Sequence, residues 1–248
     1  MAEYTHDRIV PFKDSELGKK QQIANMFDRI AFRYDFLNRF LSGGIDIYWR
    51  KKAIRGLKDL QPQQILDVAT GTGDMAIMMS RYLSPKKIVG VDISTGMLEI
   101  GRQKITRQQL DGLITLYTGD SEALHFPENS FDAVTVAFGV RNFEDLEKGL
   151  KEMLRVLRPG GRLVVLEFSH PKTTGIRQLY NLYLRLVAPG IGKMISSSRE
   201  AYQYLNDSVK AFPEGEAFKT ILDKSGYVQT RLQRLSFGIC TIYMGQKP

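Results

Sequence analysis

The chain has 248 residues, of which 43% are hydrophobic and 25% charged, the ordinary composition of a soluble globular protein. No apolar stretch reaches the length of about eighteen residues that a membrane span needs, and the polar start of the chain lacks the apolar core of a secretory signal. The single cysteine, Cys240, excludes an internal disulfide, so these features together favour the cytoplasm. The net charge of +8 suits nucleic acid, an anionic membrane or an acidic small molecule, and equally a merely basic protein.

Two helices are predicted at the start of the chain. Apolar residues recur at near-helical spacing from about Gly18 to Phe40, and a second helical pattern runs from Tyr48 to Leu57 after a glycine turn. Pro62 closes this region. We therefore expect residues 1–60 to form a helical cap over the site and residues 61–248 to form the main α/β domain.

Short strands and helices alternate after residue 62. The expected strands are 65–68, 87–92, 113–117, 131–138 and 162–168, and the expected helices are 74–82, about 94–105 and 142–157. Strands separated by helices form a parallel sheet through right-handed crossovers.

The C-terminal part departs from this alternation. Residues from about 170 to 212 are predicted to form a helical lid insertion, and residues 214–224 a further helix. The last two strands, 227–234 and 237–244, are too close in sequence to be parallel. The predicted fold is therefore a Rossmann-like α/β fold with a seven-stranded, mostly parallel sheet, an antiparallel C-terminal hairpin and a helical N-terminal cap.

A glycine-containing loop, Asp67–Asp74, follows the first predicted strand, where such sheets bind ligands. Its glycines also satisfy a loose dinucleotide fingerprint. Charge separates the alternatives, because carboxylates at Asp67 and Asp74 would repel a pyrophosphate but favour the sulfonium and ammonium groups of S-adenosylmethionine. Asp74 could instead be an ordinary acid at a helix N-terminus.

Two further acids follow later strands. Asp92 is placed to accept hydrogen bonds from ribose hydroxyls, as acids also do in NAD enzymes, or to serve as a turn residue before Ser94. Asp120 stands where methyltransferases of this fold receive the adenine amino group, or in a plain Gly-Asp turn. We predict S-adenosyl-L-methionine as the cofactor, bound by the following residues: Asp67, Thr70, Gly71, Thr72, Gly73, Asp92, Asp120 and Ser121.

Four segments carry a resemblance to one family. They are 34–42 followed by Trp49, 138–142, 155–161 continued through 167–169, and the tail 237–245. From about residue 27 onward the chain resembles the quinone-biosynthesis carbon methyltransferases that act on demethylmenaquinol and on the ubiquinone precursor. The resemblance implies C-methylation of a prenylated quinol, with demethylmenaquinol favoured by overall likeness. The alternative is the ubiquinone precursor, 2-polyprenyl-6-methoxy-benzoquinol, or both.

This chemistry attacks the sulfonium methyl with a ring carbon, so the site must stabilise a phenolate and accept a proton. We predict that Arg141 stabilises the anion, that Asn142 hydrogen-bonds the ring oxygen and that Tyr34 reaches the quinol from the cap. Their alternatives are a surface cation, a helix N-cap and a core aromatic respectively. No base is identified. The three histidines show no ligand spacing, so no metal is expected: His6, His125 and His170.

Partners follow from the same sequence. The segment 170–212 mixes aromatic and aliphatic residues with cations, which suits an anionic membrane surface at the inner face of the membrane, core packing or a dimer contact. A nucleic-acid methyltransferase is disfavoured, because residues 137–142 contain no proline motif and no basic-aromatic module is appended. A cofactor-binding protein without turnover stays a further alternative. The oligomeric state is not predicted.

Overall fold

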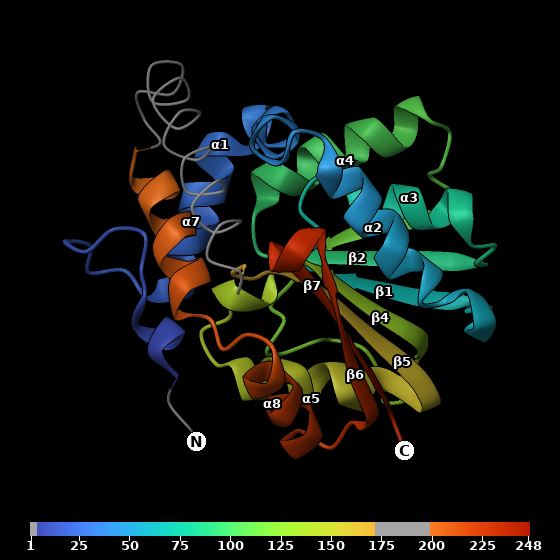
Figure 1. The fold of residues 1–248 in the computed structure, drawn as a ribbon. Helices are drawn as coiled ribbons and strands as arrows, with labels where there is room; N and C mark the ends of the chain where they lie inside the picture. Colours follow the sequence, from blue (N-terminus) through green and yellow to red (C-terminus); the bar gives the residue numbers. More distant parts are fainter. Residues whose placement is uncertain (1–3, 172–198) are drawn as a thin grey trace.

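The computed structural model describes residues 4–171 and 199–248, and their main feature is one seven-stranded sheet (Figure 1). Its strand order is β3-β2-β1-β4-β5-β7-β6. The first five strands run parallel, while β7 is antiparallel to both β5 and β6. The predicted fold class is thus confirmed. The strands are β1 (Gln64–Val68), β2 (Lys87–Asp92), β3 (Ile114–Thr118), β4 (Phe131–Ala137), β5 (Leu157–Phe168), β6 (Val228–Leu235) and β7 (Cys240–Gln246).

Buried runs of apolar residues form the central strands, since a parallel strand is covered on both faces. In β1, Leu66 pairs with Val89 of β2 on one side and with Val134 of β4 on the other. This in-register pairing brings the carboxyl ends of β1, β2 and β4 to one edge. The loops that follow these strands therefore meet at that edge, where the strand order reverses.

Helices cover both faces of the sheet (Figure 1). One face packs against α2 (Ile45–Arg55), α3 (Asp74–Tyr82) and α4 (Thr95–Arg107), through residues such as Ile54, Met79 and Leu98. The other face packs against α5 (Leu146–Val156) and α8 (Glu216–Lys224), through Leu150 and Phe218. Fully burying such a side chain contributes about 1.5–3 kcal/mol, so these two apolar layers hold the sheet.

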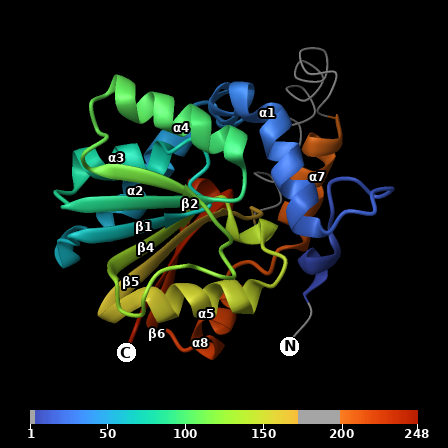
Figure 2. The same ribbon diagram turned by 180° about the vertical axis from the view of Figure 1, so that it is seen from behind.

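The helix α1 (Lys19–Ser42) lies across the carboxyl edge of the sheet, next to α7 (Arg199–Ala211), as both views show (Figure 2). It ends at Gly43 and Gly44, which both adopt left-handed conformations and turn the chain into α2. The predicted glycine turn is thus confirmed. No helix within the described ranges is long and apolar enough to cross a membrane.

The predicted helix 142–157 is wrong at its start. Residues Val140–Asn142 form the short 3-10 helix η3, and Asp145 caps α5 by accepting a hydrogen bond from the backbone N–H of Lys148 at 2.9 Å. Asn142 is therefore not the N-cap, since an aspartate three residues later takes that position. Strand β5 also begins earlier than predicted, at Leu157, because Leu157 already pairs with Phe131 of β4, ahead of a register shift. Of the predicted insertion 170–212, residues 172–198 lie outside the described residues.

Candidate active site

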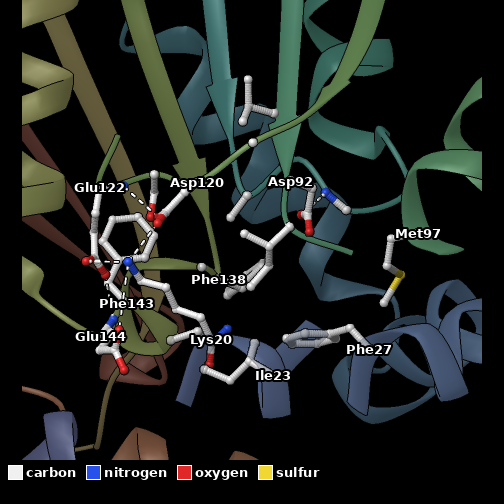
Figure 3. A pocket seen from close by; sticks show the side chains of 18 of the residues that line it. Lys20, Ile23, Phe27, Asp92, Met97, Asp120, Glu122, Phe138, Phe143 and Glu144 are labelled. Atoms are coloured by element: carbon white, nitrogen blue, oxygen red, sulfur yellow. Dashed lines mark hydrogen bonds and ion pairs between the residues drawn. The ribbon is translucent and has the colours of Figure 1, made fainter. Parts of the chain in front are cut away.

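A pocket with an empty volume of about 660 Å³ lies at the carboxyl edge of the sheet, beneath α1 (Figure 3). The loops after β1, β2, β3 and β4 form one side, which we call the strand-end wall, and α1 forms the other, the α1 wall. The residues that line the pocket include Lys20, Ile23, Phe27, Tyr34, Ala69, Gly71, Asp92, Asp120, Ser121, Glu122, Phe138, Gly139, Asn142 and Glu144.

Backbone forms the floor of the pocket. Ala69 and Gly71 both have positive φ, 52° and 57°, so the loop turns sharply between β1 and α3. A Cβ on Gly139 would lie 2.5 Å from the Cβ of Ala69, which shows how closely the loops after β4 and β1 approach each other. This bare backbone lets a ligand approach the sheet edge closely.

Asp92, at the end of β2, holds the strand-end wall together. Its two oxygens accept hydrogen bonds from the backbone N–H groups of Gly71 at 2.8 Å and Ser94 at 2.9 Å. Burial raises the pKa of this carboxyl, and the backbone donors oppose that rise. Asp92 lines the pocket where the sequence predicts the ribose contact.

Asp67 lies under the loop and does not line the pocket. It is 1% exposed, and its oxygens accept hydrogen bonds from the hydroxyls of Thr70 and Thr135, each at 2.6 Å. Burial raises its pKa to about 6, against the lowering effect of the two hydroxyls. Asp67 therefore shapes the loop from beneath.

The other end of the loop is tied to α1. The hydroxyl of Thr72 donates to Asp35 of α1 at 2.5 Å, and Lys104 of α4 pairs with both Asp35 and Asp74. Arg39 of α1 also pairs with Asp74, at 2.9 Å. Asp74 is partly buried, and these cations outweigh burial and lower the pKa of its carboxyl. Thr70, Thr72, Gly73 and Asp74 do not line the pocket.

The negative charge of the pocket comes from other acids than the two that flank the loop. Asp92, Asp120, Glu122 and Glu144 line it, and Lys20 is the sole cation among its described lining residues. Such a surplus of carboxylates suits a cationic ligand and disfavours a pyrophosphate. The structure thus supports the prediction that charge favours S-adenosylmethionine over a dinucleotide. The acids responsible are the four that line the pocket and not Asp67 and Asp74.

Lys20 of α1 lies among three of these acids (Figure 3). Its ammonium is 2.7 Å from both Asp120 and Glu122 and 3.8 Å from Glu144. The carboxylates raise the pKa of Lys20 despite its partial burial. Ser121, the other predicted adenine-side residue, lines the pocket beside this cluster. Lys20, Glu122 and Glu144 were not predicted, although Glu122, an acid two positions after Asp120, was a signal available in the sequence.

Tyr34 lies on the α1 wall as predicted and lines the pocket. Its ring packs edge-on against Phe27, with centroids 5.8 Å apart, and its Cε1 is 4.0 Å from where a Cβ on Gly71 would lie. The same wall is fixed to α4 by Asp28, which accepts hydrogen bonds from the Ser94 hydroxyl and from the backbone N–H of Gly96. The structure thus brings Tyr34 to the loop.

Arg141 lies behind the pocket and does not line it. It is 4% exposed and donates to Glu167 at 2.7 Å and to the carbonyl of Phe138 at 2.6 Å. Burial raises the pKa of Glu167, and the guanidinium opposes that rise. The surface-cation alternative is wrong, because the side chain is buried. Its Nε–H has no hydrogen-bond partner within the described part of the chain.

Asn142 lines the pocket next to this pair. Its Oδ1 accepts a hydrogen bond from the hydroxyl of Tyr204 at 3.1 Å.

Cys240 is fully buried in β7, where burial raises the pKa of its thiol well above the usual range. Within residues 4–171 and 199–248, no group of three or more potential ligands could hold a metal ion.

The sheet order, the bare glycine loop after β1 and the carboxylates at the ends of β2 and β3 define an S-adenosylmethionine-dependent methyltransferase of the Rossmann-like class. The sequence profile of the ubiE/COQ5 methyltransferase family matches residues 15–247, so the chain belongs to that family. The predictions of family, enzyme class and cofactor are thereby confirmed.

Relatives of known name match over nearly the whole chain. The demethylmenaquinone methyltransferase of Bacteroides fragilis is 48% identical, covering 98% of this chain and 99% of the relative. The ubiquinone/menaquinone biosynthesis C-methyltransferase UbiE of Geobacter sulfurreducens is 46% identical, covering 97% and 93%. These names agree with the predicted transfer of a methyl group to carbon.

Solved structures share the fold at low identity. A SAM-dependent methyltransferase from Thermotoga maritima has a TM-score of 0.62 at 20% identity, covering 90% of this chain and 99% of that one. The [4+2]-cyclase SpnF has a TM-score of 0.63 at 18% identity, covering 92% and 97%. Since a cyclase is among them, this likeness supports the fold alone.

Proposed function

We propose that the protein transfers the methyl group of S-adenosylmethionine to a ring carbon of demethylmenaquinol, a step of menaquinone biosynthesis. The observation that carries this proposal is the 48% identity to a demethylmenaquinone methyltransferase over nearly the full length of both chains. The alternative substrate is the ubiquinone precursor, since the Geobacter relative is named for both quinones.

The pocket fits the cofactor. S-adenosylmethionine, when bound, supplies an electrophilic methyl group on a positively charged sulfur. Asp92 would accept from the ribose hydroxyls, Asp120 from the adenine amino group, and the backbone around Ala69 and Gly71 would hold the amino-acid end. The four acidic side chains that line the pocket support a cationic ligand, and the bare backbone leaves room for it.

The quinol would bind on the side of Asn142 and Tyr34. An amide N–H of Asn142 would donate to the ring oxygen and stabilise it as a phenolate. Arg141 does not line the pocket and its charge is balanced by Glu167, so it would support the anion only from behind the pocket, without contacting the ring. Holding the ring carbon close to the methyl group supplies much of the remaining rate enhancement.

Residues 1–60 would act as the predicted cap through α1, which covers the pocket with Lys20, Ile23, Phe27 and Tyr34. The rest of this region does not all lie over the pocket, because α2 packs on the sheet through Trp49 and other core residues. The lid role of the segment 170–212 stays a proposal.

A peripheral membrane contact would deliver the prenylated substrate. Large apolar side chains are exposed on α1 and α2, including Phe32 at 89%, Phe36 at 53% and Tyr48 at 48%. With the net charge of +8, such a surface suits an anionic bilayer. We expect co-sedimentation with anionic liposomes at low salt and weaker binding of a Phe32→Ser/Phe36→Ser variant. Wild-type protein that stays in the supernatant would contradict this contact.

The substrate assignment is tested by incubating the purified protein with methyl-labelled S-adenosylmethionine and each demethylated quinol separately. We expect label in menaquinol, and less or none in the methylated ubiquinone precursor. Preference for the ubiquinone precursor would establish the alternative. Bound cofactor without transfer to either quinol would overturn the proposed function.

A further inference from the structure

We propose that Tyr204 is a positioning residue for methyl transfer, because its hydroxyl holds the side-chain amide of Asn142 with the NH₂ group turned toward the quinol. The inference rests on the proposed function and deepens it. Tyr204 belongs to α7, which is 62 residues away in sequence from the loop that carries Asn142.

The contact lies inside the protein and is directional. Tyr204 is 4% exposed and packs with Ile23 and Met26 of α1. Its hydroxyl donates to Oδ1 of Asn142 at 3.1 Å. A carboxamide carries its acceptor oxygen and its donor nitrogen on opposite sides, so fixing the oxygen also fixes the direction of both N–H groups. Asn142 lines the pocket, where those groups become available to a ring oxygen.

The hydroxyl of Tyr204 is a permanent donor. Burial raises its pKa well above the ordinary value, Glu167 adds to this rise, and Arg141 opposes it. The hydroxyl therefore stays protonated at every pH at which the enzyme would work. Without it, the amide of Asn142 can rotate by about 180° and present its oxygen to the developing phenolate, an interaction that is repulsive.

Tyr204 also connects three parts of the site. It joins α7 to η3 through Asn142 and to α1 through Ile23, which itself lines the pocket. Figure 1 and Figure 2 both place α7 alongside α1. The position of α7 is thus transmitted to the group that would contact the ring oxygen.

The test compares Tyr204→Phe with Tyr227→Phe. Tyr227 is a matched control, because it is also buried and donates its hydroxyl hydrogen to a backbone carbonyl, that of Leu150, at 3.0 Å. With demethylmenaquinol we expect Tyr204→Phe to lower kcat by about 10- to 100-fold. The dissociation constant of S-adenosylmethionine should change less than about twofold. Tyr227→Phe should keep the wild-type kcat.

A double-mutant cycle separates positioning from a general structural effect. In an Asn142→Ala background, Tyr204→Phe should produce no further loss of kcat, because its target is gone. Unchanged kcat in the single variant, or equal losses in both backgrounds, would overturn the inference.

A readout that does not depend on turnover distinguishes the two proposals. The side-chain ¹⁵N resonance of Asn142 should shift in Tyr204→Phe and stay in place in Tyr227→Phe. Wild-type protein that methylates neither quinol would overturn the proposed function. If the side-chain ¹⁵N resonance of Asn142 has the same chemical shift in Tyr204→Phe as in the wild type, the positioning role is overturned.

Discussion

The strand-end wall and the α1 wall of the pocket are built by different interactions. On the strand-end wall, Asp92 is held by backbone N–H groups and Asp67 by buried hydroxyls. The α1 wall is joined to the sheet edge by side-chain ion pairs from distant parts of the chain, such as Lys20 with Asp120 and Lys104 with Asp35.

This difference indicates which wall moves when a ligand enters the pocket. Partly exposed ion pairs contribute at most about 1 kcal/mol each to stability and are screened by salt. Removing a hydrogen-bond donor from a buried carboxylate costs several times more stability, because the charge is left without a partner. Lys20 is 31% exposed and Lys104 20%, while Asp67 is 1% exposed. We therefore expect the strand-end wall to be preformed and the α1 wall to open for ligands.

The largest effect is expected behind the strand-end wall, at the buried pair of Arg141 and Glu167. Arg141→Ala should lower the free energy of unfolding by about 3–5 kcal/mol, because it leaves the Glu167 carboxylate buried without its partner. Urea denaturation measures this loss. The double variant Arg141→Met/Glu167→Leu should recover part of it, since no charge is then left unpaired. A single variant as stable as the wild type would show that the pair does not support this wall.

Asp67 offers a pH-dependent test of the same wall. Its pKa is about 6 in the folded protein, against an ordinary value of 3.8, so the folded chain holds this proton more tightly. The stabilisation is complete below about pH 4 and is lost as the pH rises through 6, which amounts to about 3 kcal/mol. Asp67→Asn lacks this titration. Its free energy of unfolding minus that of the wild type should therefore rise by about 3 kcal/mol from pH 4 to pH 7, as measured by urea denaturation.

The control for this measurement is Asp59→Asn. Arg162 lowers the pKa of Asp59, so its pH dependence has the opposite sign, and its exposure keeps the effect small. If Asp67→Asn follows the wild-type pH dependence, the buried carboxyl does not titrate as the structure indicates.

Asp92→Ala should weaken S-adenosylmethionine binding by about 100-fold or more. It removes a charged acceptor from two backbone N–H groups and the proposed ribose contact, and hydrogen bonds to a charged group are worth about 1.5–3 kcal/mol each. Calorimetric titration with S-adenosylmethionine measures the change. Asp111→Ala, at an exposed acid after α4, serves as control. An affinity within a few-fold of wild type would contradict the role of Asp92.

Most of the strand-end wall could be predicted from the sequence, because its elements are local. Buried runs ending in Asp92 and preceding Asp120 place both acids at one edge of a parallel sheet, and both line the pocket. Thr72 was predicted as a cofactor contact, but it faces Asp35, a partner 37 residues earlier that no local pattern indicates. The cap and Tyr34 were predicted, but the ion pairs of the α1 wall were not, since Lys20 looks like one cation on a solvated helix face.

Arg141 shows where the sequence carried an unused signal. Glu167 is an acid within the otherwise apolar run 163–168 of β5, and a buried charge needs a partner. That rule identifies Glu167 as paired but cannot choose its partner, because the choice depends on how β5 and the loop after β4 pack. Tyr204 carried even less signal, because its contact depends on the placement of α7.

The smallest effect is expected at the α1 wall, with Lys20→Met. The variant leaves Asp120 and Glu122 facing each other without their cation, but it also frees an Asp120 oxygen for the adenine amino group. The two effects oppose each other, so S-adenosylmethionine affinity should change less than about tenfold, while its dissociation rate should rise because α1 loses an attachment. Raising the salt concentration should accelerate dissociation from the wild type and have less effect on Lys20→Met. Lys219→Met, which removes an ion pair within α8, should behave like the wild type. If Lys20→Met lost as much S-adenosylmethionine affinity as Asp92→Ala, or if the dissociation rate from the wild type did not change with salt concentration, the two walls would be equally fixed.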